Sequence, residues 1–92
     1  MSKSAEPLSL RQCDDGKWEV ENVPDNWIKC ETKEDAQIIS NAPIVLQESY
    51  ETLLPNEKVA ARLERTADKL EQYKMGFHAR RFQARAKLAR GN

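Results

Sequence analysis

Apolar and polar residues alternate along residues 8–22, and this pattern predicts a β-hairpin with one apolar face. A three-residue loop, Asp14-Asp15-Gly16, keeps the alternation on both strands and puts the glycine where such loops need a left-handed residue. A two-residue loop would oppose Leu10 to Glu21 and mix the two faces. The predicted cross-strand pairs are Gln12 with Trp18, Arg11 with Glu19, and Leu10 with Val20, so that the apolar face carries Leu8, Leu10, Trp18 and Val20.

The hairpin is followed by signals for a turn, a strand and a short helix. Residues 23–26 contain Pro24 and Asp25 and predict a turn, after which Trp27–Glu31 forms a third strand. Thr32 and Asp35 have the spacing of a capping box, in which the hydroxyl of Thr32 accepts a hydrogen bond from the backbone N–H of Asp35. The predicted helix runs over residues 33–41, ends near Pro43 and covers the sheet.

Residues 44–54 fit two kinds of element. Ile44, Val45 and Leu46 have strand propensity, whereas Leu46, Tyr50 and the leucines at 53 and 54 recur at helical spacing. Pro43 can also occupy the first turn of a helix. The pattern favours a helix and leaves a strand as the alternative.

A longer amphipathic helix is predicted from residue 56 onward, with Asn56 as its N-cap. An unbroken helix to Arg90 would be about 52 Å long, whereas a compact globule of this size has a radius of gyration of only about 12 Å. Either the helix breaks near Gly76, or it continues and packs against a second copy or a partner. The predicted apolar stripe consists of Val59, Leu63, Ala67, Leu70, Tyr73, Phe77, Ala84 and Leu88.

These elements predict an α+β fold: a two- or three-stranded antiparallel meander, a short packing helix and a long amphipathic C-terminal helix. The chain has 92 residues, which suffices for one domain. We expect a disordered N-terminus over residues 1–7, an acidic α+β core over residues 8–54 and a helical C-terminal half with a basic end over residues 55–92. Trp18 and Trp27 are expected to anchor the core, because a small core depends on large apolar side chains.

The formal net charge is zero, but the charges are separated along the sequence. Residues 1–54 contain five basic and eleven acidic side chains, a net charge of −6, and residues 55–73 balance. Residues 74–92 contain six basic side chains and no acidic one. The basic end therefore either docks on the acidic block of the same chain or of a dimer mate, or remains a solvated face, or binds an external acidic surface.

The basic end is the most informative segment for function. It interleaves apolar residues with cations, a composition typical of helices that lie along nucleic acid, an acidic protein or an anionic surface. The candidate contacts to nucleic acid or an acidic surface are Lys74, Arg80, Arg81, Arg85, Lys87 and Arg90, and the candidate protein-binding residues are Leu63, Leu70, Tyr73 and Phe77.

The sequence offers no signature of catalysis, of a cofactor or of a metal site. His78 stands among cations without a carboxylate to orient it. Cys13 and Cys30 lack a chelating spacing and fit a reducing compartment, and Lys17 is expected to lower the pKa of Cys13. The acidic loop at residues 14–16 lacks the later ligands of a calcium loop.

No apolar run approaches the length needed to cross a bilayer, and residues 1–7 do not have the pattern of a secretory signal. We therefore expect a cytoplasmic, non-enzymatic protein that acts as a protein–protein interaction or adaptor module and takes no small-molecule substrate. A homodimer is one form of this hypothesis. Binding of RNA or DNA through residues 74–90 is the alternative.

Overall fold

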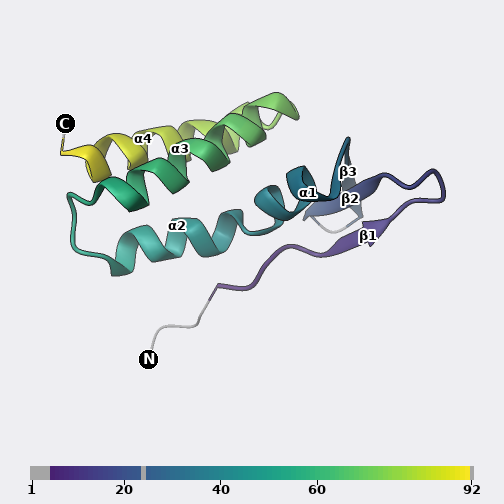
Figure 1. The fold of residues 1–92 in the computed structure, drawn as a ribbon, viewed down its shortest axis with the longest axis horizontal. Helices are drawn as coiled ribbons and strands as arrows, with labels where there is room; N and C mark the ends of the chain where they lie inside the picture. Colours follow the sequence, from purple (N-terminus) through teal and green to yellow (C-terminus); the bar gives the residue numbers. More distant parts are fainter. Residues whose placement is uncertain (1–4, 24, 92) are drawn as a thin grey trace.

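A computed structural model describes residues 5–23 and 25–91 and confirms the α+β fold (Figure 1). One three-stranded antiparallel sheet, with strand order β1-β2-β3, is followed by four helices. The elements are β1 (Leu10–Gln12), β2 (Trp18–Val23), β3 (Asn26–Cys30), α1 (Lys33–Ser40), α2 (Ala42–Glu51), α3 (Glu57–Gln72) and α4 (Gly76–Arg90). Of the predicted disordered segment, residues 1–7, the first four lie outside the described residues.

The hairpin has the predicted register. Leu10 pairs with Val20, Arg11 with Glu19, and Gln12 with Trp18. The loop is closed by a hydrogen bond from the backbone N–H of Cys13 to the carbonyl of Lys17, 2.7 Å long, and Gly16 has φ +86°. The third strand is confirmed within one residue at each end; the turn before it contains Pro24, which lies outside the described residues.

Two short helices connect the sheet to the helical half. The hydroxyl of Thr32 caps α1 by accepting from the N–H of Asp35 at 3.1 Å, as the capping box predicts. α1 covers one face of the sheet, burying Ala36 and Ile39 against Val20 and Cys30. Residues 42–51 form α2, so that the ambiguous segment is helical over most of its length.

The long helix predicted from residue 56 onward is broken near Gly76, which was one of the two alternatives. Gly76 itself, however, does not end the first part of that helix. α3 ends at Gln72, and Lys74 takes the left-handed conformation with φ +63°. The N–H of Met75 donates to the carbonyl of Leu70 at 2.8 Å, and that of Lys74 to Glu71 at 3.1 Å. This is a Schellman motif with a lysine where glycine is usual, and Gly76 is the first residue of α4.

The break changes which residues of α4 face inward. A stripe continued through the break would point Phe77, Ala84 and Leu88 toward the core. Instead all three are exposed, because the turn resets the phase of the helix. The inward residues of α4 are Ala79, Phe82, Ala86 and Ala89, at spacings of three and four.

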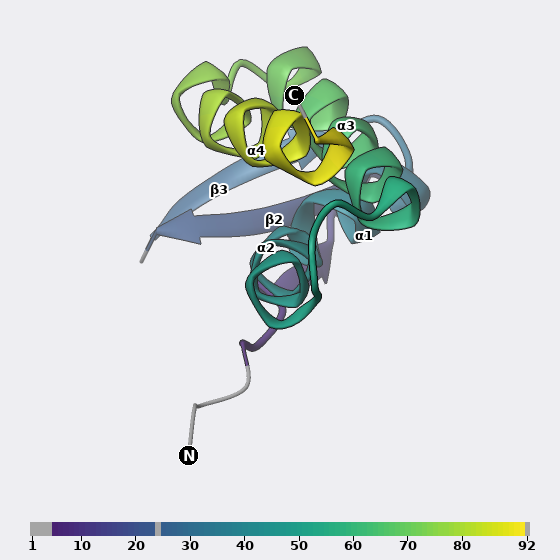
Figure 2. The same ribbon diagram turned by 90° about the vertical axis from the view of Figure 1, so that its left-hand side faces the viewer.

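α3 and α4 pack side by side as an antiparallel pair (Figures 1 and 2). The buried residues of both helices include several alanines, which we call the alanine seam: Ala60, Ala67, Ala79, Ala86 and Ala89. Small side chains let two helix axes approach closely. The far end of the pair is closed by the N–H of Asn56, which donates to the carbonyl of Ala89 at 2.7 Å. Asn56 also caps α3 as predicted, accepting from the N–H of Val59.

Trp27 is not a core residue, contrary to the expectation from sequence. Its partner in the β2–β3 ladder is Glu21, the guanidinium of Arg11 lies 3.9 Å from its ring centre, and Trp27 does not belong to the buried core cluster. Trp18, on the other face of the sheet, packs partly buried against the core. No helix within the described ranges is long and apolar enough to span a membrane.

Candidate binding surface on helix α4

One face of α4 is left uncovered by the rest of the fold. Its residues follow at spacings of three, four and seven and are all exposed. Phe77 is 77% exposed and Leu88 is 55% exposed, which is unusual for side chains of this size. We call this surface the α4 outer face: Phe77, Arg80, Arg81, Ala84, Lys87 and Leu88.

The two flanks of α4 are engaged with neighbouring helices. Toward α3, Arg90 forms two hydrogen bonds to the carboxylate of Glu64, one of them 2.8 Å long. This guanidinium lowers the pKa of Glu64 below its ordinary value. Toward α2, Arg85 donates to the hydroxyl of Ser49 at 3.1 Å and to its carbonyl at 2.9 Å. Arg85 also lies 4.1 Å from the ring centre of Tyr50. Arg85 and Arg90 therefore hold α4 in place.

The other four predicted cations have no acidic partner in the described part of the chain. They are Lys74, Arg80, Arg81 and Lys87, and none of them forms an ion pair or a side-chain hydrogen bond there. All four are exposed. The basic end is thus divided into two residues that stabilise the fold and four that remain available.

Three carboxylates of the acidic block pair with cations of α3 instead. Arg62 pairs with Glu48, Arg65 with Glu34 at 3.3 Å, and Lys69 with Asp35 at 2.8 Å. The hypothesis that the basic end docks on the acidic block of its own chain is therefore wrong for the described residues. Because α3 lies between α1 and α4, its cations reach the acidic side chains first (Figure 2).

The four residues predicted to bind a protein partner do not form one exposed stripe. Leu63 and Leu70 are buried in the core, with at most 1% of their surface exposed. Tyr73 is partly buried and engaged in an internal network. Phe77 alone lies on the open surface, beyond the break between the helices.

Tyr73 ties the end of α3 to the beginning of α1. Its hydroxyl donates to the carboxylate of Asp35 at 2.5 Å and accepts from the N–H of Glu31 at 3.0 Å. Burial and this carboxylate raise the pKa of Tyr73 to about 12. Lys69 and Tyr73 in turn lower the pKa of Asp35. Tyr73 and Lys69 both bond to Asp35, so the network stabilises the junction of α3 with α1.

The cysteines lie apart from the α4 outer face. Cys13 and Cys30 are free thiols. Burial and the adjacent carboxylate of Glu19 raise the pKa of Cys13, so the lowering expected from Lys17 is wrong. Burial raises the pKa of Cys30 to about 11. Both thiols are therefore poor nucleophiles at neutral pH.

His78 follows Phe77, and the two rings meet edge to face with centres 5.7 Å apart. Within the described residues, no group of three or more histidine, cysteine or acidic side chains could hold a metal ion.

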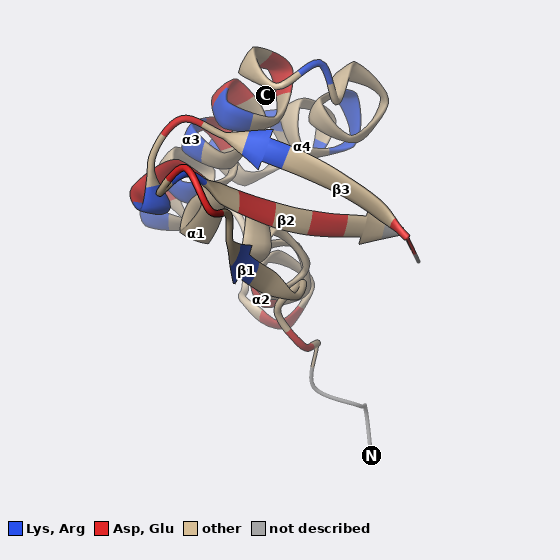
Figure 3. Cartoon of the chain, turned by 90° about the vertical axis from the view of Figure 1, so that its right-hand side faces the viewer, with Lys and Arg blue, Asp and Glu red and all other residues tan. Residues whose placement is uncertain are grey.

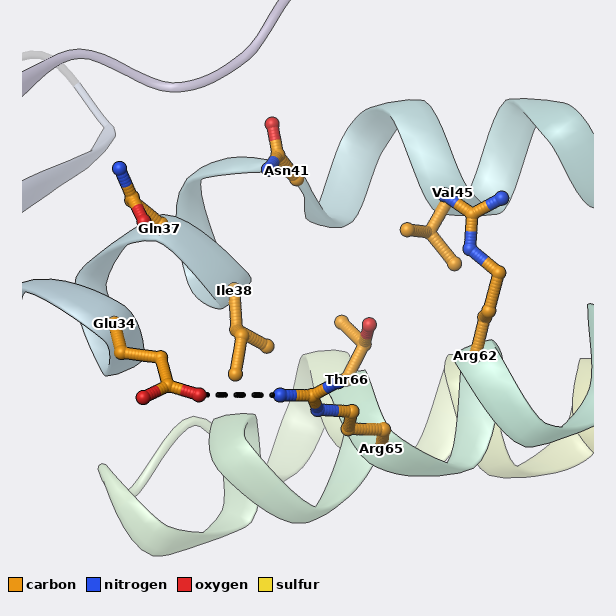
Figure 4. Close-up of a pocket in the computed structure, with 8 residues that line it drawn as sticks. All are labelled: Glu34, Gln37, Ile38, Asn41, Val45, Arg62, Arg65 and Thr66. Atoms are coloured by element: carbon orange, nitrogen blue, oxygen red, sulfur yellow. Dashed lines mark hydrogen bonds and ion pairs between the residues drawn. The ribbon is translucent and has the colours of Figure 1, made fainter.

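A cavity of about 330 Å³ lies between α1, α2 and α3 and is drawn in Figure 4. Arg65 reaches across it to Glu34, and Ile38 and Thr66 line it between the helices. The other arginine that lines this cavity, Arg62, pairs with Glu48. Since both cations are already neutralised, this cavity has no charge left for a ligand.

Leu53 and Tyr50 are two further exposed apolar residues, and the sequence pattern does not predict their exposure. Leu53 is 90% exposed in the segment between α2 and α3. Tyr50 is 63% exposed, and its ring packs against the guanidinium of Arg85. Tyr50 lies on an exposed side of α2, whereas Leu53 follows the end of α2 at Glu51. Comparison with known proteins finds no match: no family model, no curated protein and no solved structure is similar to this chain.

Proposed function

We propose that this chain is a non-enzymatic protein-interaction module that binds an acidic segment of another protein on the α4 outer face. One observation carries the proposal. Within residues 5–23 and 25–91, the α4 outer face is left uncovered and combines unpaired cations with two exposed large apolar side chains, Phe77 and Leu88. Such a combination favours a partner that supplies both carboxylates and apolar groups. A reducing cytoplasm suits this role, because both thiols are free.

A protein partner fits better than nucleic acid. The α4 outer face combines its cations with two exposed large apolar side chains, which an acidic protein segment with apolar residues would cover and a phosphate backbone would not. The net charge of the whole chain is zero, and β2 carries Glu19 and Glu21 on its open face (Figure 3). Domains that bind nucleic acid usually carry a marked positive charge.

A homodimer formed by two copies of the α4 outer face is disfavoured. A twofold axis would place the same patch against itself, so that Arg80, Arg81 and Lys87 would face the same cations of the second copy. Like charges at such an interface oppose association. The partner is therefore acidic where this surface is basic.

A peptide selection tests the proposal. The full chain selects binders from a random peptide library displayed on phage, and the affinity of the enriched peptides is measured by fluorescence polarisation. We expect peptides rich in Asp and Glu that carry large apolar residues. The triple variant Arg80→Gln, Arg81→Gln, Lys87→Gln should bind them at least tenfold more weakly, and Phe77→Ser should weaken them as well.

The matched control is Lys58→Gln on α3, which removes an exposed cation that forms no ion pair with any residue the structure describes. Equal binding by the triple variant and the control would contradict the proposal. A labelled single-stranded RNA and a DNA duplex are measured in parallel. Tight binding of either, lost in the triple variant and falling steeply with salt, would favour the nucleic-acid alternative.

A further inference from the structure

A second cavity, beside the α4 outer face, has a chemistry unlike the others. It lies between the beginnings of α2 and α4, the end of α3 and β2, and its volume is about 220 Å³. α4 packs on α3 and α2, but within the described residues no Cα of α4 comes within 8 Å of a strand Cα. This separation leaves the cavity open. Its lining residues are Leu8, Asn22, Ala42, Pro43, Leu46, Leu70, Met75, His78, Arg81 and Phe82.

The floor of this cavity is the hydrophobic core itself. Leu70, Met75 and Phe82 are buried, while Leu8 and Leu46 are half-buried and form the walls. An apolar group placed here would cover leucine surface that the chain alone leaves partly in water. Removing such surface from water contributes about 25 cal/mol per Å².

Arg81 is the one charged side chain among the described residues that line the cavity. Asn22, His78 and Arg81 line it, and no carboxylate does. The three other cavities described in the structure each include at least one glutamate: Glu34, Glu48 with Glu51, and Glu64. Arg81 is also one of the cations without an acidic partner. A ligand of this cavity would therefore have an apolar body and a negative charge near its rim.

The volume indicates what kind of ligand this is. Pockets for small molecules are typically 300–1,000 Å³, and this cavity is smaller. It matches one large side chain of the type that anchors protein interfaces in well-packed pockets. The cavity also adjoins the α4 outer face, because Arg81 belongs to both and His78 packs against Phe77.

We propose that this cavity receives a single large apolar side chain, such as Leu, Phe or Trp, from the acidic segment that binds the α4 outer face, with a neighbouring carboxylate of that segment at Arg81. The inference rests on the proposed function and adds its specificity: the partner needs an anchor residue next to acidic ones. A purely acidic segment would bind the cations but leave the cavity empty.

A fragment titration tests the cavity without any peptide. Indole-3-acetate and the uncharged indole-3-acetamide are titrated into the isotope-labelled full chain and followed by NMR. Saturable shifts at Met75, His78 and Phe82 are expected, with the acetate binding several-fold more tightly than the amide. Arg81→Gln should abolish that difference. Shifts that do not saturate, or that lie elsewhere, would overturn the proposal.

Two variants fill the cavity from opposite sides. Leu46→Trp adds bulk from α2, and Asn22→Phe adds it from β2, so that one serves if the other does not fold. Each should weaken indole-3-acetate at least tenfold. The matched control is Leu53→Trp, which adds the same ring at an exposed position outside the cavity and should leave binding unchanged.

The selected peptides provide the second arm. Replacing the largest apolar residue of a peptide by Ala should weaken binding to the natural chain at least tenfold and have little further effect on Leu46→Trp. If peptide binding needs Arg80 and Lys87 but survives both the Ala replacement in the peptide and Leu46→Trp in the protein, the anchor pocket is wrong and the proposed function still stands. Fragments that bind while no acidic peptide does would instead overturn the proposed function.

Discussion

Helices α3 and α4 lie side by side, and each carries a row of lysines and arginines along its surface. On α3, three of the four cations form ion pairs with carboxylates of α1 and α2. On α4, Arg90 pairs with Glu64, Arg85 bonds to Ser49, and three cations have no partner within the described residues. The same composition therefore stabilises the fold on one helix and forms a free surface on the other.

The position of each helix explains the difference. α3 is central and touches α1, α2 and α4, whereas α4 packs on α3 and, more lightly, on α2. Carboxylates of α1 and α2 pair with cations of α3 and, among the described residues, form no ion pair with those of α4. A row of cations in a sequence thus says little about binding until the nearest carboxylates have been located.

The largest effect should separate buried from exposed leucines of the two helices. Leu63→Ala should cost about 3 kcal/mol of unfolding free energy, because it leaves a cavity in the core. Leu88→Ala, on the α4 outer face, should cost less than about 0.5 kcal/mol. Urea denaturation measures both, and similar losses would contradict the assignment of the two faces.

The next effect concerns the cations themselves. Lys69→Met removes the cationic partner of the buried carboxylate of Asp35, which keeps its hydrogen bond from Tyr73, and should cost about 2 kcal/mol. Lys87→Met removes an unpaired cation and should change stability by less than about 0.5 kcal/mol. If the lysine of α4 proved as important for unfolding as that of α3, the comparison between the helices would fail.

The pH dependence of stability should follow the same division. Lys69 and Tyr73 lower the pKa of Asp35 below 3.8, so the unfolded chain takes up a proton at this position before the folded chain does. The stabilisation is full above the unfolded pKa and is lost as the pH falls through the folded one. Between pH 7 and pH 3, Lys69→Met should therefore lose less stability than the natural chain. A parallel decline in both would speak against this pair.

The smallest effect tests the turn that separates the helices. Lys74 adopts a left-handed conformation that costs a side-chain-bearing residue about 1 kcal/mol, so Lys74→Gly should stabilise the fold by roughly that amount. Gly76→Ala should also stabilise it, by up to about 1 kcal/mol, since Gly76 lies in a helix and an added Cβ meets nothing within 4 Å. Thermal unfolding measures both effects. If Gly76 instead ended α3, Gly76→Ala would destabilise the fold.

Local signals in the sequence predicted much of the fold. The register of the hairpin followed from Gly16 and the alternation of residues, and the caps at Thr32 and Asn56 followed from side-chain chemistry that acts within one helical turn. The phase of α4 did not follow, because a lysine rather than a glycine forms the left-handed turn and no residue type announces it. The position of Trp27 outside the core depends on which face of the sheet α1 covers, and the second cavity depends on how far α4 stands from the strands.

The alanine seam has a consequence for how this protein can change. The distance of α4 from α3 is fixed by side chains that bear a single methyl group, such as Ala79 and Ala86, and both are almost fully buried. A valine or leucine there would push α4 outward and alter the width of the second cavity without touching its lining. The specificity of the anchor pocket is thus encoded partly in residues that no partner would ever reach, and substitutions at the seam could retune it from a distance.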